Sequence, residues 1–170
     1  MTNGKRKGKK AELEIARIFR QHGYIEAKRS QQYCGADGDG DVIGVPNLHI
    51  EVKRRQAFDI KASLKQAEND AREGMFPVVF YRANRKPWVA VLRWETFSKI
   101  YQSSEKMLNL VARSSKTNLI YKWLEDAKKE CTTRDSAIGN ICPDGHYVFM
   151  DIEAFIEMYR LSDYGGKVNV

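Results

Sequence analysis

Three residues with the chemistry of a metal-ion site stand close together in the first third of the chain: Asp41, Glu51 and Lys53. Side chains alternate faces along a β-strand, so Glu51 and Lys53 share a face if the apolar run around them is a strand. A break at Pro46-Asn47 allows the runs that contain Asp41 and Glu51 to pair as a hairpin. Two carboxylates beside a lysine suit Mg²⁺ and the cleavage of a phosphodiester.

Other interpretations of these residues stay open. Asp37 and Asp39 could be ligands in place of Asp41, but only Asp41 adjoins the apolar run, so we expect the other two to be loop acids. Glu51 and Lys53 could also form an exposed salt bridge on a strand.

An amphipathic helix over about 9–22 precedes the hairpin, and Gly23 is suited to end it. With about 100° between successive residues, the apolar side holds Ala11, Ile15, Ile18 and Phe19. Glu12 lies within this side, whereas Glu14 lies toward the polar side. A buried acid is costly unless it is paired, so Glu12 is the candidate for the site. It could instead be a helix N-terminal acid that the helix dipole favours.

The remaining pattern predicts an α/β fold, with a mixed sheet and helices packed on it. The elements expected in the first part are a strand at about 24–29, the hairpin, a helix at about 60–73, and strands at about 77–82 and 88–92. Those expected after it are helices at about 96–102, 104–111, 118–130 and 152–159, and a strand at about 147–150. The last part of the chain is therefore expected to be mainly helical.

The size and charge of the chain narrow the function classes. Its 170 residues suffice for one domain with a real core, and no apolar run approaches a membrane span. The basic start has no apolar run after it, so it is not a secretory signal. Three cysteines far apart do not form a disulfide framework, which favours a reducing compartment such as the cytoplasm. A formal charge of +7 indicates a polyanionic partner, although a basic protein without such a partner remains possible.

The motifs together resemble the PD-(D/E)xK nuclease superfamily, and within it the archaeal and phage Holliday junction resolvases. The resemblance covers roughly residues 4–95. It rests on a basic, glycine-containing start that leads into an acid-bearing helix, on Arg29-Ser30, on Gly40-Asp41-Val42-Ile43, on Ile50-Glu51-Val52-Lys53, and on Pro77-Val78-Val79-Phe80. Two departures are Gly40 where the family name has proline, and a C-terminal extension of about 70 residues. The resemblance implies a restriction-endonuclease-like fold with an αβββαβ core.

The resemblance also implies roles for individual residues. Asp41 and Glu51 are the expected Mg²⁺ ligands, with Mn²⁺ as a possible substitute, and Glu12 completes or orients the site. Lys53 is expected to orient the attacking water or to offset charge in the transition state. The expected DNA contacts are Lys5, Arg6, Lys7, Lys9, Lys10, Arg29, Ser30, Arg54, Arg55 and Gln66. A zinc site from Cys131, Cys142 and His146 is not favoured, because no close cysteine pair is present.

The sequence therefore predicts a Mg²⁺-dependent, structure-selective DNA endonuclease that resolves Holliday junctions and acts as a homodimer, in the host cytoplasm if a phage encodes it. We expect a flexible basic arm at 1–8, a nuclease core at 9–102 and an extension at 103–170 that packs on the core. One rival is another nuclease of the superfamily that nicks duplexes or cuts flaps. The other is a non-catalytic DNA-binding protein on a nuclease scaffold.

Overall fold

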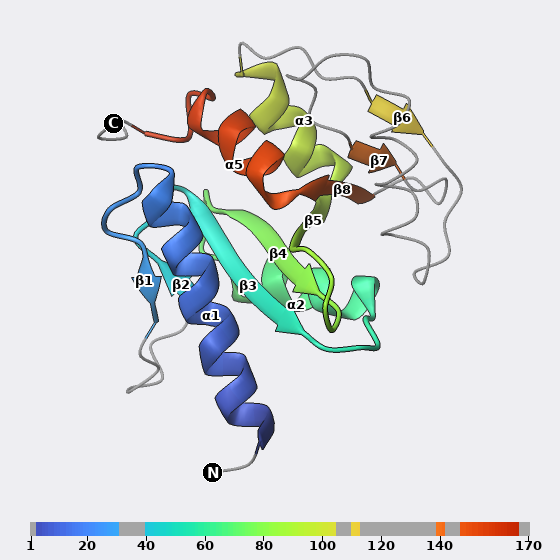
Figure 1. The fold of residues 1–170 in the computed structure, drawn as a ribbon. Helices are drawn as coiled ribbons and strands as arrows, with labels where there is room; N and C mark the ends of the chain where they lie inside the picture. Colours follow the sequence, from blue (N-terminus) through green and yellow to red (C-terminus); the bar gives the residue numbers. More distant parts are fainter. Residues whose placement is uncertain (1–2, 31–39, 105–109, 113–138, 142–146, 167–170) are drawn as a thin grey trace.

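A computed structural model describes residues 3–30, 40–104, 110–112, 139–141 and 147–166. Its centre is a single mixed sheet with the strand order β1-β2-β3-β4-β5-β8-β7-β6 (Figure 1). The strands are β1 (Lys28–Arg29), β2 (Val42–Ile43), β3 (Leu48–Arg54), β4 (Phe76–Arg82), β5 (Val89–Arg93), β6 (Leu110–Ala112), β7 (Gly139–Ile141) and β8 (Tyr147–Asp151). Parallel pairing joins β3 to β4 and β6 to β7, and the other neighbours are antiparallel.

Helices cover both faces of the sheet. The helices described are α1 (Asn3–Gln21), α2 (Ile60–Asp70), α3 (Trp94–Gln102) and α5 (Ile152–Arg160). One apolar cluster joins α1, α3 and α5 to alternate strand residues such as Ile50, Phe80 and Val148. A second cluster packs Leu64 and Ala67 of α2 on the opposite face. This mixed α/β arrangement confirms the predicted restriction-endonuclease-like fold.

The crossover through α2 gives the sheet its parallel centre. The side chain of Asp59 accepts a hydrogen bond from the N–H of Ala62, which satisfies one of the free donors at the start of α2. The helix then returns the chain so that β4 lies beside β3 in parallel register, with Glu51 opposite Val79 and Lys53 opposite Tyr81. The predicted helix and strand are confirmed here, although α2 ends at Asp70, a few residues earlier than expected.

The first helix differs from its prediction. We expected a flexible arm at 1–8 and a helix from about residue 9, but α1 already begins at Asn3 and runs without interruption to Gln21. Lys and Arg are good helix formers, and they outweigh Gly4 and Gly8 in this stretch. The first turns of α1 project below the ends of β3 and β4 in the view of Figure 1. The basic residues therefore lie on a helix.

The C-terminal extension also differs in part from its prediction. We expected it to be mainly helical, but its described residues form the strands β6, β7 and β8 and the helix α5. β8 pairs with β5, and α5 places Phe155, Ile156 and Tyr159 in the main core. Periodicity alone does not distinguish a short apolar run in a strand from one in a helix, which is why β6 was missed. The predicted helix at 118–130 lies outside the described residues.

Candidate active site

The hairpin of β2 and β3 brings Asp41 beside Glu51. The N–H of Asp41 donates to the carbonyl of Ile50 at 2.7 Å, and the N–H of Val52 donates to Oδ2 of Asp41 at 2.8 Å. Val42 lies opposite Ile50 in the antiparallel register, so Asp41 continues the ladder beside Glu51. The predicted hairpin and the proximity of the two acids are confirmed.

Gly40 allows this close approach. A Cβ atom at Gly40 would lie 2.6 Å from the carbonyl oxygen of Ile50 and 2.8 Å from its nitrogen, which no side chain can occupy. On the other side, the N–H of Ser30 donates to the carbonyl of Asp41 at 2.9 Å. Ser30 is buried and supports Asp41 through its backbone, while its predicted contact with a phosphate stays a prediction.

The two acids interact electrostatically. Burial and the nearby charge of Glu51 raise the pKa of Asp41 to about 7, with a smaller contribution from Glu12. The Val52 N–H and Lys53 act in the opposite direction. Glu51 itself is only 6% exposed. Two carboxylates held together at low exposure carry a charge that a cation can offset.

Lys53 offsets part of the negative charge of the two acids. Its Nζ lies 2.7 Å from Oε2 of Glu51, which agrees with the predicted shared strand face. The same Nζ donates to Oε1 of Gln66 on α2 at 3.0 Å. Gln66 was assigned to DNA binding from the resemblance, but in the structure it contacts the lysine. Two acceptors from different elements thus hold the ammonium beside the acids.

Glu12 is near enough to this group to contribute to the raised pKa of Asp41, but its side chain pairs with a residue outside the group. Its Oε2 accepts a hydrogen bond from Nε of Arg29 on β1, and both side chains are partly buried. The expectation that a buried Glu12 must be paired is confirmed, but its partner is an arginine. Among the described residues, no three His, Cys, Asp or Glu side chains converge closely enough to hold a metal ion together. The expected meeting of three acids at one ion is therefore not seen in this arrangement.

His49 is a residue near the site that the sequence reading missed. It precedes Glu51 by two positions on β3, so its side chain lies on the same strand face. Only 1% of it is exposed, and neither ring nitrogen has a hydrogen-bond partner within the described part of the chain. The alternation of His49, Glu51 and Lys53 along the strand was the signal that could have identified it.

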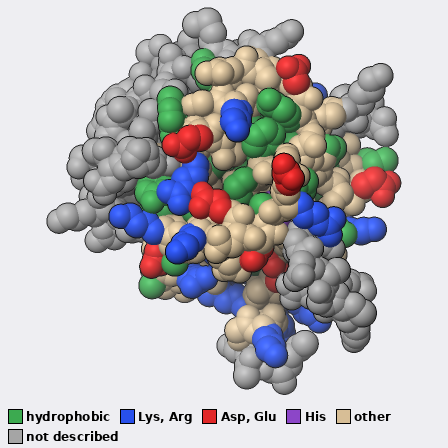
Figure 2. All heavy atoms as spheres, turned by 180° about the vertical axis from the view of Figure 1, so that it is seen from behind, with side chains coloured by type: hydrophobic (Ala, Val, Ile, Leu, Met, Phe, Trp, Pro, Cys, Tyr) green, Lys and Arg blue, Asp and Glu red, His purple; other side chains and the backbone are tan. Residues whose placement is uncertain are grey.

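The basic residues assigned to DNA fall into two groups. Lys5, Arg6, Lys9 and Lys10 are exposed on α1, while the partly buried Lys7 donates to Asn84 at 2.8 Å. Arg55 is exposed and Arg54 is partly buried at the end of β3. Figure 2 shows Lys and Arg side chains mostly in the lower half of the face seen from behind, with acidic side chains among them. Arg29 differs from these groups because Glu12 pairs with it.

The neighbouring acid on α1 has a structural partner. Glu14 pairs with Arg82 of β4 at 2.5 Å, and the guanidinium of Arg82 also lies 4.9 Å from the centre of the Trp88 ring. This ion pair fastens α1 to the sheet. Several residues that the sequence analysis named as candidates lie outside the described part: Asp37, Asp39, Cys131, Cys142 and His146.

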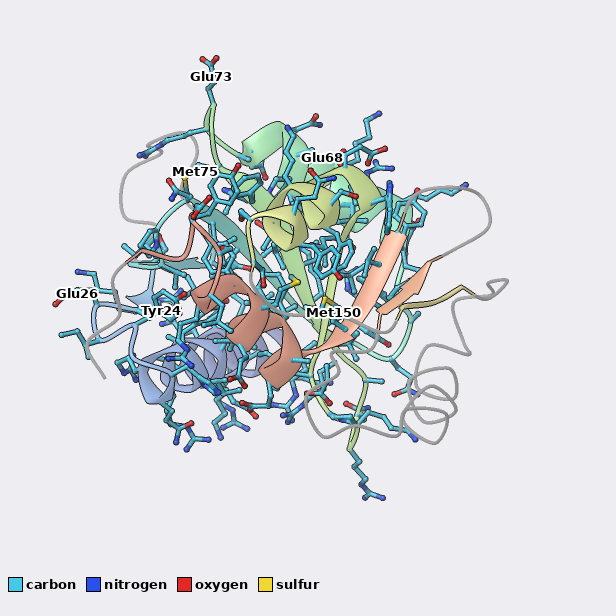
Figure 3. All side chains as sticks on the ribbon, turned by 90° about the horizontal axis from the view of Figure 1, so that it is seen from above. Tyr24, Glu26, Glu68, Glu73, Met75 and Met150 are labelled. Atoms are coloured by element: carbon cyan, nitrogen blue, oxygen red, sulfur yellow. The ribbon has the colours of Figure 1, made fainter. Side chains whose placement is uncertain are left out.

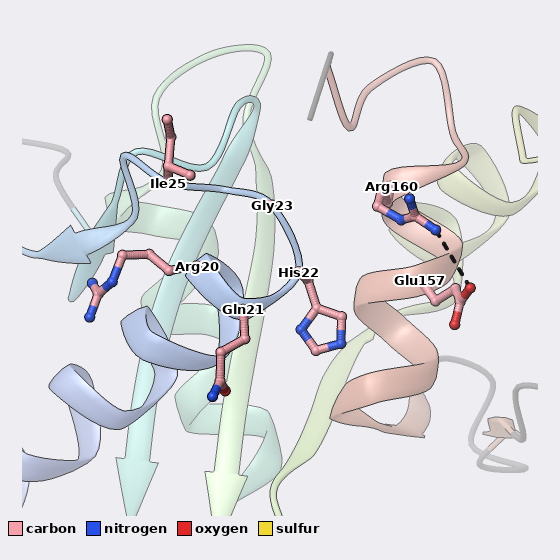
Figure 4. Close-up of a pocket in the computed structure, with 7 residues that line it drawn as sticks. All are labelled: Arg20, Gln21, His22, Gly23, Ile25, Glu157 and Arg160. Atoms are coloured by element: carbon pink, nitrogen blue, oxygen red, sulfur yellow. Dashed lines mark ion pairs between the residues drawn. The ribbon is translucent and has the colours of Figure 1, made fainter. Parts of the chain in front are cut away.

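A pocket of about 430 Å³ lies at the C-terminal end of α1, between the loop after this helix and α5 (Figure 4). Its lining consists of Arg20, Gln21, His22, Gly23, Ile25, Glu157 and Arg160. Arg20 follows Glu12 by eight helical residues, which places it about 12 Å farther along the axis. Neither Asp41 nor Glu51 lines the pocket, so it is separate from the carboxylate pair.

The fold and the arrangement of Asp41, Glu51 and Lys53 define the class of protein as a nuclease of the PD-(D/E)xK superfamily. The family model described as "phage putative PDDEXK endonuclease" matches residues 3–140, and the chain belongs to this family. Comparison with curated proteins and with solved structures gives no match. Nucleases of the superfamily generally use divalent metal ions, and the family implies a DNA substrate. No described helix has the length and apolar character needed to cross a membrane.

The residues present fit a divalent cation. Mg²⁺ in nucleases is commonly held by one or two carboxylates together with waters and substrate phosphate, so a cage of three protein acids is not required. Asp41 and Glu51 supply two oxygen donors. Burial first, and the charge of Glu51 second, raise the pKa of Asp41, and a bound cation would offset both effects.

Proposed function

We propose that this protein is a Mg²⁺-dependent, structure-selective DNA endonuclease that resolves Holliday junctions by paired cleavage in recombination or replication. The observation that carries the proposal is that Asp41, just before β2, and Glu51, on the neighbouring strand β3, lie next to each other at low exposure and beside Lys53. The family membership supports the nuclease chemistry. The junction as substrate rests on the resemblance of the motifs alone.

Each site residue has a proposed role. Asp41 and Glu51 hold the ion, which supplies an activated water and stabilises charge on the scissile phosphate when bound. Lys53, held by Gln66, stabilises the negative charge that develops on the phosphate. Glu12 orients the site by holding Arg29, whose charge then lies at the edge of the sheet near the acids. Mn²⁺ is expected to replace Mg²⁺, because both ions prefer oxygen ligands.

The DNA is proposed to run along the basic side of α1 and past the end of β3. The exposed residues Lys5, Arg6, Lys9, Lys10 and Arg55 would contact phosphates, with partly buried Lys7 and Arg54 beside them. Residues 9–102 would carry the nuclease core, with residues 103–170 packed on it. A two-fold homodimer would present two sites to the two strands of like polarity that must be cut.

A cleavage assay tests this proposal. The purified protein is incubated with a mobile four-way junction and with linear duplex of equal length, in Mg²⁺, in Mn²⁺ and in EDTA. We expect symmetrical incisions in the junction that EDTA abolishes. Equal cleavage of the two DNAs would remove the junction assignment and favour a nicking or flap nuclease. Binding without cleavage in either metal would favour a non-catalytic DNA-binding protein.

Substitutions then test the site itself. Asp41→Asn and Glu51→Gln keep the shape of each side chain and remove its charge, so both should abolish cleavage while DNA binding in Ca²⁺ persists. Glu73→Gln is the matched control, because Glu73 is exposed and points away from the body of the protein (Figure 3). Unchanged cleavage by either site variant would contradict the assignment.

A further inference from the structure

The segment that follows α5 is fastened to the turn between β2 and β3. The hydroxyl of Tyr159 donates to the carbonyl of Pro46 at 2.5 Å and also lies 3.1 Å from the carbonyl of Tyr164. Nδ2 of Asn47 donates to the same Tyr164 carbonyl at 2.9 Å. Gly166 lies close to the ring of Pro46: a Cβ atom at Gly166 would lie 3.1 Å from Cγ of the proline. The C-terminal end of the described chain thus lies against this turn.

The turn needs a specific backbone conformation. Asn47 has a φ of 52°, in the left-handed region that Asn adopts more readily than most residues. Its carbonyl accepts the N–H of Phe76 at 2.7 Å, and the ring of Phe76 packs edge-to-face on Tyr164 at 4.7 Å. The contact therefore joins the turn, the start of β4 and the C-terminal segment.

This turn separates Asp41 from Glu51. β2 contains only Val42 and Ile43, so few ladder hydrogen bonds hold the strand that follows Asp41. β3 is longer and is paired along its length with β4. Besides the hydrogen bonds that Asp41 makes itself, its position relative to Glu51 therefore depends on how firmly the turn is held.

The residues that hold the turn lie beyond the part of the chain that matches the family, which ends at residue 140. Tyr159 is fully buried in the main core and packs on Phe155 with ring centres 5.9 Å apart. Burial raises the pKa of Tyr159, so its hydroxyl remains a hydrogen-bond donor. A rigid, buried donor is suited to fix a backbone carbonyl.

We propose that Tyr159 is a positioning residue: through the carbonyl of Pro46, it holds the turn between β2 and β3 and thereby sets the geometry of Asp41 against Glu51. The inference rests on the proposed function only where it concerns the metal ion. It gives the C-terminal extension a role in the site, because an element distant in sequence completes the support of the hairpin.

The test compares Tyr159→Phe with Tyr24→Phe. Tyr24 belongs to the same core and lies 6.5 Å from Tyr159 between ring centres, but its buried hydroxyl has no hydrogen-bond partner among the described residues. Both variants remove one buried hydroxyl from a neighbouring ring. Only Tyr159→Phe removes a hydrogen bond to the turn, so a difference between the variants reports that bond.

The first readout is amide hydrogen exchange at Val52, whose N–H donates to Asp41. We expect Tyr159→Phe to speed this exchange about five-fold, the equivalent of one net hydrogen bond, and Tyr24→Phe to change it less than two-fold. Asn47→Gly keeps a residue suited to positive φ and removes the bond to Tyr164, so it should act as Tyr159→Phe does. Equal exchange in all the proteins would overturn the proposal.

The second readout is Mn²⁺ binding by calorimetry without DNA. If Asp41 and Glu51 are held less firmly, the affinity for Mn²⁺ should fall about three- to ten-fold in Tyr159→Phe and Asn47→Gly. The affinity of Tyr24→Phe should stay near that of the unaltered protein. Faster exchange with unchanged Mn²⁺ affinity would show that the contact only stabilises the fold, and would overturn the positioning role. If the unaltered protein binds no metal, the proposed function fails, and exchange at Val52 still decides whether Tyr159 holds the hairpin.

Discussion

The ammonium of Lys53 lies 2.7 Å from a carboxylate oxygen of Glu51, and both side chains lie on one face of β3. The lysine thus places a positive charge directly beside the acids. We expect Lys53→Met to reduce cleavage by about 10²- to 10³-fold, because the charge that develops on the phosphate loses its fixed cation. The measurement is single-turnover cleavage at saturating Mg²⁺.

Lys65→Met is the control for this variant, since Lys65 is exposed on the same helix as Gln66. It should cleave DNA as the unaltered protein does, and both variants should bind DNA in Ca²⁺ with affinities within about two-fold. Full activity in Lys53→Met would show that the lysine has no part in the chemistry.

The raised pKa of Asp41 predicts a pH-dependent stability. Its pKa is about 7 in the folded protein and about 3.9 in an unfolded chain, so the folded state binds more protons between these values. The contribution of Asp41 to stability is therefore complete below about pH 4 and is lost as pH rises through 7. Asp41→Asn removes this loss and keeps an oxygen that can accept the Val52 N–H.

We consequently expect Asp41→Asn to melt several degrees higher than the unaltered protein at pH 8, and at nearly the same temperature at pH 4.5. Thermal unfolding in EDTA at the two pH values measures the difference, with Glu73→Gln as the control. A variant that melts lower at pH 8 would mean that burial and the charge of Glu51 do not destabilise the ionised form of Asp41.

Metal binding should show the complementary dependence on pH. A proton on Asp41 competes with the cation, so Mn²⁺ affinity should rise as pH increases from 6 to 8 and then level off. Calorimetry without DNA measures this directly. An affinity that is constant over this range would remove Asp41 from the ion-binding group.

Gly40 allows β2 to approach β3 immediately before Asp41. Gly40→Ala places a methyl group against the backbone of Ile50, so the strands must separate. We expect a loss of about 1–3 kcal/mol in the free energy of unfolding and weaker Mn²⁺ binding. Gly74→Ala is no suitable control because of its positive φ, whereas Gly4→Ala meets no neighbouring atom and should be tolerated. Denaturant unfolding and calorimetry measure the two effects.

The basic residues at the start of α1 should make DNA affinity depend strongly on salt. If about six phosphates are contacted, affinity should fall on the order of 10³-fold between 50 and 200 mM salt. Replacing Lys5, Arg6, Lys9 and Lys10 by Gln should reduce the slope of log K against log salt by about one for each phosphate contact that is lost. Lys61→Gln with Lys65→Gln on α2 is the control. An unchanged slope in the α1 variant would place the DNA elsewhere.

The local pattern of the sequence was sufficient for the hairpin, the shared face of Glu51 and Lys53, the need of the partly buried Glu12 for a partner, and the crossover through α2. These features follow from side-chain alternation and helical periodicity, which act over a few residues. The same alternation places His49 on the face of β3 that carries Glu51 and Lys53.

Other features depend on contacts between residues distant in sequence. Periodicity predicted that Glu12 needs a partner, but only the packing of α1 against β1 decided that this partner is Arg29. The link from Tyr159 to Pro46 joins residues more than a hundred positions apart, and no local pattern encodes it. The sequence by itself determined which acids and which lysine are candidates for the site, because the face of a strand or helix on which a residue lies depends only on local geometry. Tertiary packing decided which of them meet, since ion pairs form only where folding brings opposite charges within reach.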